Sequence, residues 1–417
     1  MNKIVTSVGL LALGASALHA AESSTLNKLQ DTKAWSVQAT LRGFYDDNVA
    51  NIPGGDESAG FEVNPSVKFG MPGEQTSFNV GYSFSGKFYD KNKNGRDGKS
   101  DYTHTFDADL AHAFSPRLDV ALSESFVIGQ EPDILQDPVG VQRIDGDNIR
   151  NFAGIDFNLA VTELLGLSFG YNNALYDYDN AGGTAAAPSN SGLFDRLDHS
   201  FRLDTRWRLS PQTVGIVGYT YSQIDYTGDE IISVNSITTL PEMSDSRNSQ
   251  GHTLYVGAQH IFSPLLSGTL LVGAQHYSFD RFGADSEVSP FVQGSVSYAL
   301  ETKTSVEAGV KYSRSPANIA TAQDTETAQV YASLRREIIS KLIGSLNGTY
   351  SDSKYNGGGA GVDGAHQIYY RVGVDLAYQF NEFLSGHGGY NYDKLDSDLA
   401  GRSYDRNRVY LGVTAGF

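Results

Sequence analysis

One short segment concentrates residues that could act on a solute. From Asp198 onward a polar or charged residue occupies every second position, in the order Asp198, Ser200, Arg202, Asp204, Arg206, Arg208. The residues between them are mostly apolar or aromatic. Side chains on a β-strand point alternately to opposite faces, so this spacing predicts a basic row along one face. Such a row attracts some charged solutes and repels others.

Charges of both signs recur in the same register along the rest of the chain. So many charges cannot be packed in dry protein, because each unpaired ion costs several kcal/mol there. We therefore expect one water-filled space to be lined by Arg42, Lys68, Lys87, Arg202, Arg206, Arg208, Lys311, Arg335, Arg371, Arg406 and Arg408, with Glu62, Asp107, Asp109, Asp119, Asp156, Asp198, Asp204, Glu307 and Asp375. The pore-lining set predicted from them is Arg202, Asp204, Arg206, Arg208, Arg335, Arg371 and Asp375. Either these charges select anionic or hydroxyl-rich solutes such as sugars, or they pair across strands and only hold the wall in shape.

A second cluster resembles half of a calcium-binding loop. Oxygen ligands at alternate positions, a Gly at the bend and an acid at the twelfth position suit calcium, and the chain supplies Asp90, Asn92, Asn94, Gly95 and Asp101. Four basic residues lie in the same loop, and Asp replaces the usual bidentate Glu. A solvated turn explains the segment more simply, and calcium stays open as the one cofactor that the sequence suggests.

The sequence offers little else for catalysis. It contains no nucleophile elbow, no phosphate-binding Gly loop and no zinc-binding His-Glu motif, so we expect no enzyme. The absence of Cys excludes disulfides and thiolate metal sites. The net charge of −17 argues against a nucleic-acid partner, because phosphate binding needs a basic surface.

The elements that carry these charges are predicted to be strands of about ten to fourteen residues. About ten residues are enough for a tilted strand to cross a bilayer, whereas strands of soluble sheets usually have five or six. We expect strands at 34–45, 59–70, 76–89, 102–114, 118–129, 149–161, 165–177, 197–209, 213–226, 252–262, 266–279, 288–300, 304–314, 327–336, 341–351, 367–380, 384–392 and 404–417. The fold class is therefore all-β, an antiparallel transmembrane outer-membrane β-barrel of about 18 strands, with 16 as the alternative.

The connections and the apolar rows support a barrel. Tight turns alternate with long polar loops, as in bacterial outer-membrane barrels, and the apolar face of each strand would meet lipid. Two details depart from the alternation of apolar and polar faces. Glu124 falls in an apolar row, which places it near the headgroup boundary or calls for a bulge. Strand 213–226 has apolar residues in both registers, so its faces are left unassigned.

The two ends of the chain indicate export and assembly. Residues 1–20 combine a basic start with an apolar stretch and a small residue at the end, and we expect a signal peptide. Residues 21–33 would form a short periplasmic N-terminal segment, and 34–417 the transmembrane barrel. The terminal Phe417 on an amphipathic final strand predicts a recognition signal for the outer-membrane assembly machinery.

Short motifs resemble a known family. The run Tyr45-Asp46-Asp47-Asn48-Val49 and the apolar-Ser-Pro turns at 114–116, 209–211 and 262–264 are similar to those of the β-barrel porin type 2 family of bacterial outer-membrane proteins. The resemblance implies an outer-membrane barrel, in some members placed near polysaccharide-export systems. It implies no particular solute and no catalytic residue.

These observations together predict a porin-like channel in the outer membrane of a Gram-negative-type bacterium. We expect passive diffusion of small hydrophilic solutes and ions, with outer-membrane lipids and lipopolysaccharide around the barrel. A homotrimer is left open. The alternatives are a barrel for surface polysaccharide export, a structural outer-membrane protein, or an outer-membrane lipase, which would need Ser and His together on the outer surface.

Overall fold

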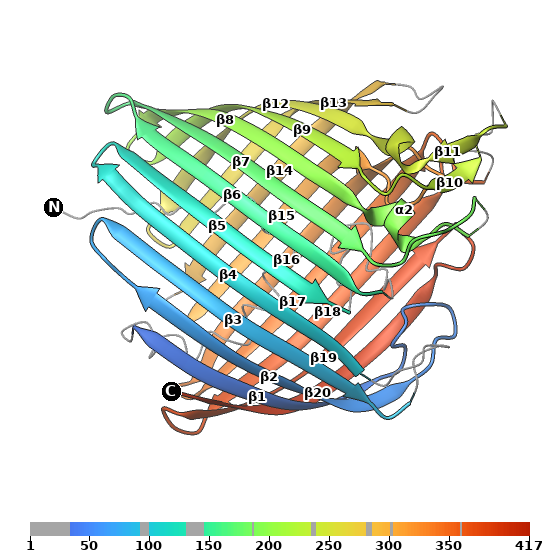
Figure 1. Ribbon diagram of the computed structural model, residues 1–417. Helices are drawn as coiled ribbons and strands as arrows, with labels where there is room; N and C mark the ends of the chain where they lie inside the picture. Colours follow the sequence, from blue (N-terminus) through green and yellow to red (C-terminus); the bar gives the residue numbers. More distant parts are fainter. Residues whose placement is uncertain are drawn as a thin grey trace.

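The predicted architecture of eighteen antiparallel strands is confirmed. The computed structural model describes residues 34–91, 100–130, 146–185, 187–234, 239–280, 286–300, 303–358 and 361–417, so the expected signal peptide and leader lie outside the described residues. One closed barrel contains all eighteen long strands (Figure 1), because β1 pairs with β2 on one side and β20 on the other. Closure gives each of the eighteen strands a neighbour on both sides. Among the described residues, no helix has the length and apolar character needed to cross a membrane.

The barrel strands are β1 (Trp35–Asp46), β2 (Ser58–Met71), β3 (Thr76–Tyr89), β4 (Ser100–Ser115), β5 (Leu118–Gly129), β6 (Asn148–Ala160), β7 (Leu165–Tyr178), β8 (Arg196–Ser210), β9 (Thr213–Tyr226), β12 (Ser249–Ser263), β13 (Leu266–Phe279), β14 (Glu287–Leu300), β15 (Thr304–Pro316), β16 (Asp324–Ile339), β17 (Leu342–Asn356), β18 (His366–Gln379), β19 (Leu384–Ser397) and β20 (Tyr404–Gly416). The longer loops add α2 (Asn190–Phe194), the hairpin β10 (Ile231–Val234) with β11 (Pro241–Met243), and the 3₁₀ helix η1 (Ser244–Arg247). The sequence predicts only long polar loops in these regions, so these four elements are additions to the predicted fold.

Short connections gather at one end of the barrel, called here the turn end, and long ones at the other, the loop end (Figure 1). The Ser-Pro turns share one type of hydrogen bond, in which the Ser hydroxyl oxygen accepts from backbone N–H groups of the turn. The Ser115 hydroxyl oxygen accepts hydrogen bonds from the backbone N–H groups of Arg117 and Leu118, at 3.2 and 3.1 Å. Ser210 and Ser263 accept from the backbone in the same way, and a register shift precedes each turn. Local Ser bonds of this kind favour turns, so these dipeptides fix the tight connections.

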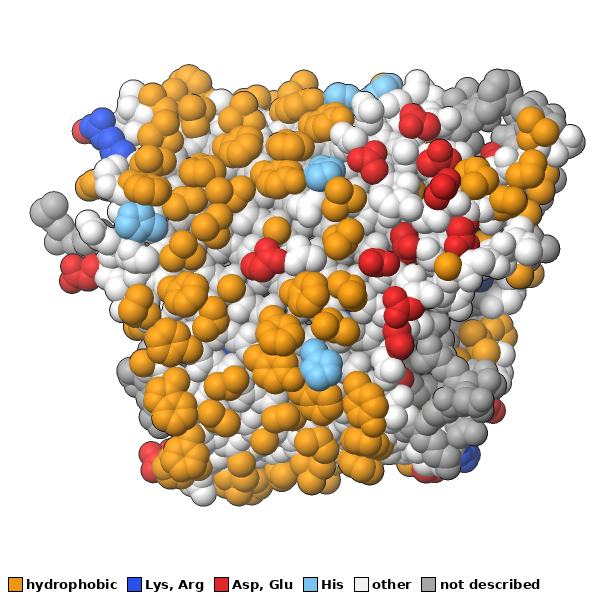
Figure 2. All heavy atoms as spheres, in the orientation of Figure 1, with side chains coloured by type: hydrophobic (Ala, Val, Ile, Leu, Met, Phe, Trp, Pro, Cys, Tyr) orange, Lys and Arg blue, Asp and Glu red, His pale blue; other side chains and the backbone are white. Residues whose placement is uncertain are grey.

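Apolar side chains point outward around the barrel. On β1 the exposed residues Trp35, Val37, Leu41 and Tyr45 alternate with more buried ones. Figure 2 shows apolar side chains spread over one outer face, with carboxylates gathered toward the loop end. A wide apolar outer band with a polar rim is what a bilayer requires of a barrel.

The structure assigns the faces of β9, which the sequence left open. Val217 and Tyr219 are exposed and lie beside Thr205 and the outward-facing Leu203 of β8. Ile216 faces inward and is buried against Tyr255. Strand β9 therefore has apolar residues on both faces, because one face belongs to the lipid-facing row and the other contributes to an apolar patch inside the barrel.

Glu124 remains on the outer face. Its register partners Ala108 and Ala153 are continuous with the rest of β4 and β6, and the one register shift of this pair of strands lies at 113–115. A bulge, one of the two explanations offered for Glu124, is therefore wrong, and a position near the headgroup boundary stays a prediction. The exposed carboxylate instead accepts a hydrogen bond from the side-chain amide of Asn151 on β6.

Candidate functional site

The interior of the barrel holds a cavity of about 530 Å³. Its wall runs from β8 to β18 and includes Arg202, Asp204, Arg206 and Arg371. Arg208, Arg335 and Asp375 share the inward register of these residues but do not line the cavity. All seven residues of the predicted pore-lining set thus lie on the inner face, and their part in permeation stays a prediction.

Several of the inward charges are paired across strands. An Arg202 Nη lies 2.8 Å from Asp156 Oδ1 on β6, and Arg202 Nε lies 3.9 Å from Asp204. Arg371 Nε lies 2.5 Å from Asp393 Oδ1 on β19. Of the two explanations offered by the sequence, pairing that holds the wall in shape applies to Arg202 and Arg371.

Ion pairs also reinforce the closure of the barrel. Arg406 of β20 forms a bidentate pair with the buried Asp46 of β1, and Arg42 of β1 pairs with the buried Glu62 of β2. Two hydrogen bonds in fixed geometry make Arg–carboxylate pairs strong and specific. The first pair joins the first and last strands, and the second joins β1 to β2.

A smaller set of inward cations lacks such partners. Arg206 donates to the side-chain oxygen of Gln259 at 3.1 Å. Within the described ranges, no carboxylate oxygen lies within 4 Å of Arg206, Arg208, Lys311 or Arg335. Lys68 and Arg408 of the predicted inward set likewise have no carboxylate oxygen within 4 Å in the described part of the chain, so the uncompensated positive charge of this set lies at six positions. Sequence reasoning could not separate them from the paired arginines, because the partners come from other strands.

Tyrosines of the inner wall lie flat across neighbouring strands. A Cβ at Gly218 would come within 2.4 Å of the Tyr255 ring, so only glycine fits there. The Tyr255 hydroxyl donates to Asp204 Oδ1 at 2.5 Å. The glycine lets the ring rest against the wall, which keeps its bulk out of the interior.

The tip of the β15–β16 hairpin, residues 313–323, folds into the barrel. Pairing of β15 with β14 stops at Tyr312, and the backbone N–H of Arg314 donates at 2.9 Å to Gln275 on β13, one strand further along. The Arg314 guanidinium binds Asp324 and Glu326, both at 3.2 Å. This tip, called here the inward tip, narrows the interior near the loop end.

Further contacts hold the inward tip in place. Ala317 and Ala322 pack on Tyr355 of β17, whose side chain is fully buried. The buried Arg247 of η1 donates to the carbonyl of Ala317 and to that of Leu193 in α2, both at 2.7 Å. One arginine therefore ties three loop-end segments together.

The residues of the suggested calcium loop are only partly described. Asn92 and Asn94 lie outside the described residues. Asp90 accepts hydrogen bonds from the Ser58 hydroxyl at 2.6 Å and the backbone N–H of Ala59 at 3.0 Å, and the first of these lowers the pKa of its carboxyl below the usual value. Asp101 is buried at the start of β4. No cluster of three or more metal-binding side chains occurs in the described part of the chain.

Phe417 completes the turn end of the barrel. Its backbone N–H donates to the carbonyl of Val37 on β1 at 2.8 Å, and its exposed ring packs on Phe383 with the centroids 5.3 Å apart. Its role in assembly stays a prediction.

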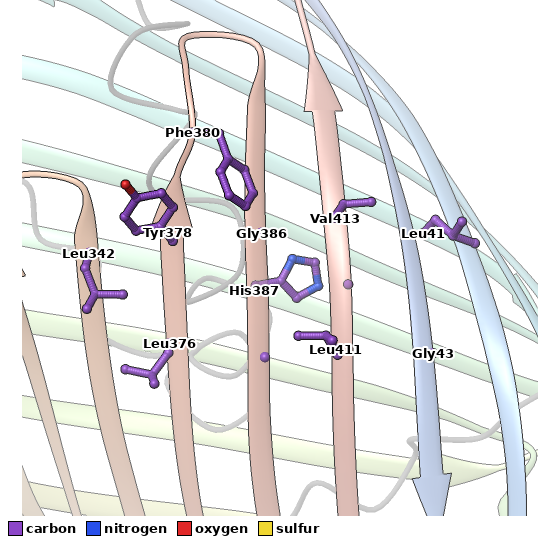
Figure 3. A pocket seen from close by; sticks show the side chains of 12 residues that line it. Leu41, Gly43, Leu342, Leu376, Tyr378, Phe380, Gly386, His387, Leu411 and Val413 are labelled. Atoms are coloured by element: carbon purple, nitrogen blue, oxygen red, sulfur yellow. The ribbon is translucent and has the colours of Figure 1, made fainter.

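A groove of about 670 Å³ runs along the wall where β18, β19, β20 and β1 meet (Figure 3). Leu376, Tyr378 and Phe380 border it on one side and Leu411 on the other. Gly386 brings no side chain to the outer face between them. The lining is almost wholly apolar, so in a bilayer this groove would hold hydrocarbon.

Comparison with solved structures finds similar chains at low identity. The chain is similar to OccAB4 of Acinetobacter baumannii, with 11% identity, 92% of this chain and 99% of the other covered, and a TM-score of 0.48. For the outer membrane protein opdK of Pseudomonas aeruginosa the values are 12%, 92%, 99% and 0.46. For a mutant of the ferric enterobactin receptor PfeA of Pseudomonas aeruginosa they are 10%, 91%, 80% and 0.46.

The sequence comparison is more specific. No curated protein matches the chain. The family model described as "Putative beta-barrel porin 2" matches residues 36–417, which is nearly the whole barrel. The resemblance inferred from the short motifs is thereby confirmed, and the chain belongs to this porin family.

Proposed function

We propose that the protein forms a pore in the bacterial outer membrane through which small hydrophilic solutes and ions diffuse passively. The observation that carries the proposal is the opposite character of the two faces of one closed barrel. The outer face is apolar, whereas the inner face carries charged, hydroxyl and amide side chains around a cavity. A polar interior of this kind holds water in large barrels.

The inward tip affects the width of the proposed solute path through the barrel. It occupies space inside the barrel near the loop end, and its residues Ser313 and Ser315 line the cavity. A narrowing of this kind favours small solutes over large ones. It supports diffusion of small solutes more than passage of a polymer.

Planar bilayer recording tests the proposal. The purified, refolded protein should insert in discrete steps, with a current proportional to voltage in KCl. Absence of steps from a sample that shows β-sheet circular dichroism and a heat-dependent shift on gel electrophoresis would contradict a pore. That outcome would favour a structural barrel.

A charge-reversal variant tests whether the uncompensated cations lie on the path. Arg206→Glu with Arg208→Glu should move the reversal potential in a KCl gradient toward cation selectivity, because neither arginine has a carboxylate partner within the described residues. Arg336→Glu makes the same kind of change on the exposed outer side of β16 and should leave the reversal potential unchanged. Equal shifts in both variants would show that the arginines act only through net charge.

A further inference from the structure

The inner wall contains an apolar patch where a water-filled barrel would need none. Ile216, Tyr255, Leu271 and Phe291 all line the interior cavity, and they pack together as one cluster. The Tyr255 and Phe291 rings have centroids 5.7 Å apart. The rest of the cavity wall is mainly Ser, Thr, Gln and charged side chains. Ile216, Tyr255 and Phe291 are largely covered, while Leu271 is only partly buried, so the patch borders the cavity with a small apolar surface. Apolar side chains beside a few polar groups are the usual lining of a ligand site.

Two of the uncompensated cations stand at the ends of this patch. The strand register places six residues in one row along the wall, in the order Arg206, Ile216, Gly257, Leu271, Gln293, Lys311. Five inter-strand steps of about 4.8 Å separate Arg206 from Lys311 along this row, so a small solute would reach one cation at a time. The apolar patch lies between the two positive ends.

The other charges of the cavity wall are largely neutralised. Arg202, Arg314 and Arg371 each have a carboxylate partner, and Asp204 accepts a hydrogen bond from Tyr255. Glu307 also lines the cavity, four residues from Lys311 on β15. Arg206 and Lys311 are thus the cavity-lining cations with no carboxylate oxygen within 4 Å in the described part of the chain, and these two lie beside the apolar patch.

We propose that this stretch of the inner wall binds small carboxylates that carry an apolar or aromatic body. The carboxylate would meet Arg206 or Lys311, while the body covers Ile216, Leu271 and the ring of Phe291. Guanidinium and ammonium groups form charge-assisted hydrogen bonds with carboxylates, and covering the patch removes apolar surface from water. The inference rests on the proposed pore, since it names the class of solute that the path would favour.

Current block in planar bilayers distinguishes this class from its neighbours. Benzoate carries both features, gluconate carries the charge without the apolar body, and benzyl alcohol carries the ring without the charge. Benzoate should half-block the KCl current at a concentration at least about tenfold lower than either of the others. Equal blocking by benzoate and gluconate would overturn the inference while leaving the pore intact.

Variants separate the two parts of the site. Arg206→Gln with Lys311→Gln should remove the preference for benzoate over benzyl alcohol. Ile216→Thr with Leu271→Thr should instead remove the preference for benzoate over gluconate. Arg336→Gln, which removes one positive charge from the outer face, should keep both preferences. Loss of both in Arg336→Gln would contradict a local site.

A binding measurement decides the inference even if no current is seen. Saturation-transfer NMR on the detergent-solubilised full-length protein should show transfer to the benzoate ring, reduced at least about fivefold by the Ile216→Thr and Leu271→Thr pair. Absence of channel steps together with such transfer would contradict the pore and keep the site. Channel steps, together with equal saturation transfer in the native and variant proteins, would support the pore and contradict the binding site.

Discussion

Inward charges of the barrel divide into two kinds according to their partners. Arg42, Arg202, Arg371 and Arg406 each bind a carboxylate on another strand. Removing one member of such a partly buried pair leaves the other charge uncompensated, which is costly. Arg206 makes a single bond to a neutral amide. We therefore expect changes at the first group to affect folding and changes at Arg206 to affect solutes.

The outward carboxylate of Glu124 predicts a gain in stability on its removal. A carboxylate in the lipid-facing band is destabilising, and here it is offset by a hydrogen bond from Asn151. Glu124→Leu together with Asn151→Leu should raise the free energy of unfolding in phosphatidylcholine vesicles by about 1 kcal/mol or more, measured by guanidinium titration. Glu124→Gln keeps the bond and should give a smaller rise. A loss of stability in the double variant would show that the polar pair is needed at this site.

Asp195, after α2 at the loop end, predicts a pH effect. Burial raises the pKa of its carboxyl to about 6, against hydrogen bonds from Ser191 and the backbone N–H of Tyr178, whereas in the unfolded chain it is about 3.9. The folded loop thus favours the protonated acid. The stabilisation is fully present below about pH 4 and is lost as the pH rises through 6.

Amide exchange reports this effect directly. Protection of residues 190–196, corrected for intrinsic rates, should fall between pH 5 and pH 7 in the native protein. Asp195→Asn should be insensitive to pH over this range. Protection that rises with pH, or an unchanged profile in the variant, would contradict the assignment.

At the scale of elements, the inward tip is the feature that most alters the path. It exists because β15 stays paired with β16 beyond the point where it leaves β14. Arg247 of η1 connects the inward tip to α2, through hydrogen bonds to the carbonyls of Ala317 and Leu193. Neither bond involves the side chain of its acceptor residue, so no sequence pattern could have revealed it.

Releasing that connection should widen the path. Arg247→Ala removes the hydrogen bonds to the carbonyls of Ala317 and Leu193 and the contact with the Tyr226 ring. We expect a larger single-channel conductance in KCl with more frequent fluctuations, because the inward tip then moves more freely. Asp245→Ala, on the exposed side of η1, is the matched control and should keep the native conductance. A conductance of Arg247→Ala equal to that of the control would show that the inward tip does not limit the current.

The elements that the sequence predicts well are the barrel strands, because each has one apolar face and one polar face. Alternation placed all eighteen barrel strands, since a one-residue slip would turn every apolar side chain toward the interior. It failed on the faces of β9, where Ile216 joins a patch inside the barrel while Val217 meets the outside. The short elements α2, β10, β11 and η1 were missed because contacts between distant loops hold them.

At the scale of the whole molecule, the inward or outward side of a residue could be predicted, whereas its partner could not. The strand register predicts that Arg202 and Arg206 lie on the same face. It does not predict that Arg202 pairs with Asp156, because Asp156 belongs to another strand, β6. The same holds for closure, where the bond between Arg406 and Asp46 joins the two ends of the chain. A porin family match over residues 36–417 agrees with this barrel as a single unit.

Cysteine labelling tests the central claim most directly, that one face of each strand meets water inside the barrel and the other meets lipid. The chain contains no Cys, so each introduced thiol is unique. In proteoliposomes a membrane-impermeant maleimide should label Ser200→Cys and Thr220→Cys, on the inner face, and should spare Leu203→Cys and Tyr219→Cys, on the outer face. Labelling of the outer pair at the rate of the inner pair, in folded protein, would contradict the account.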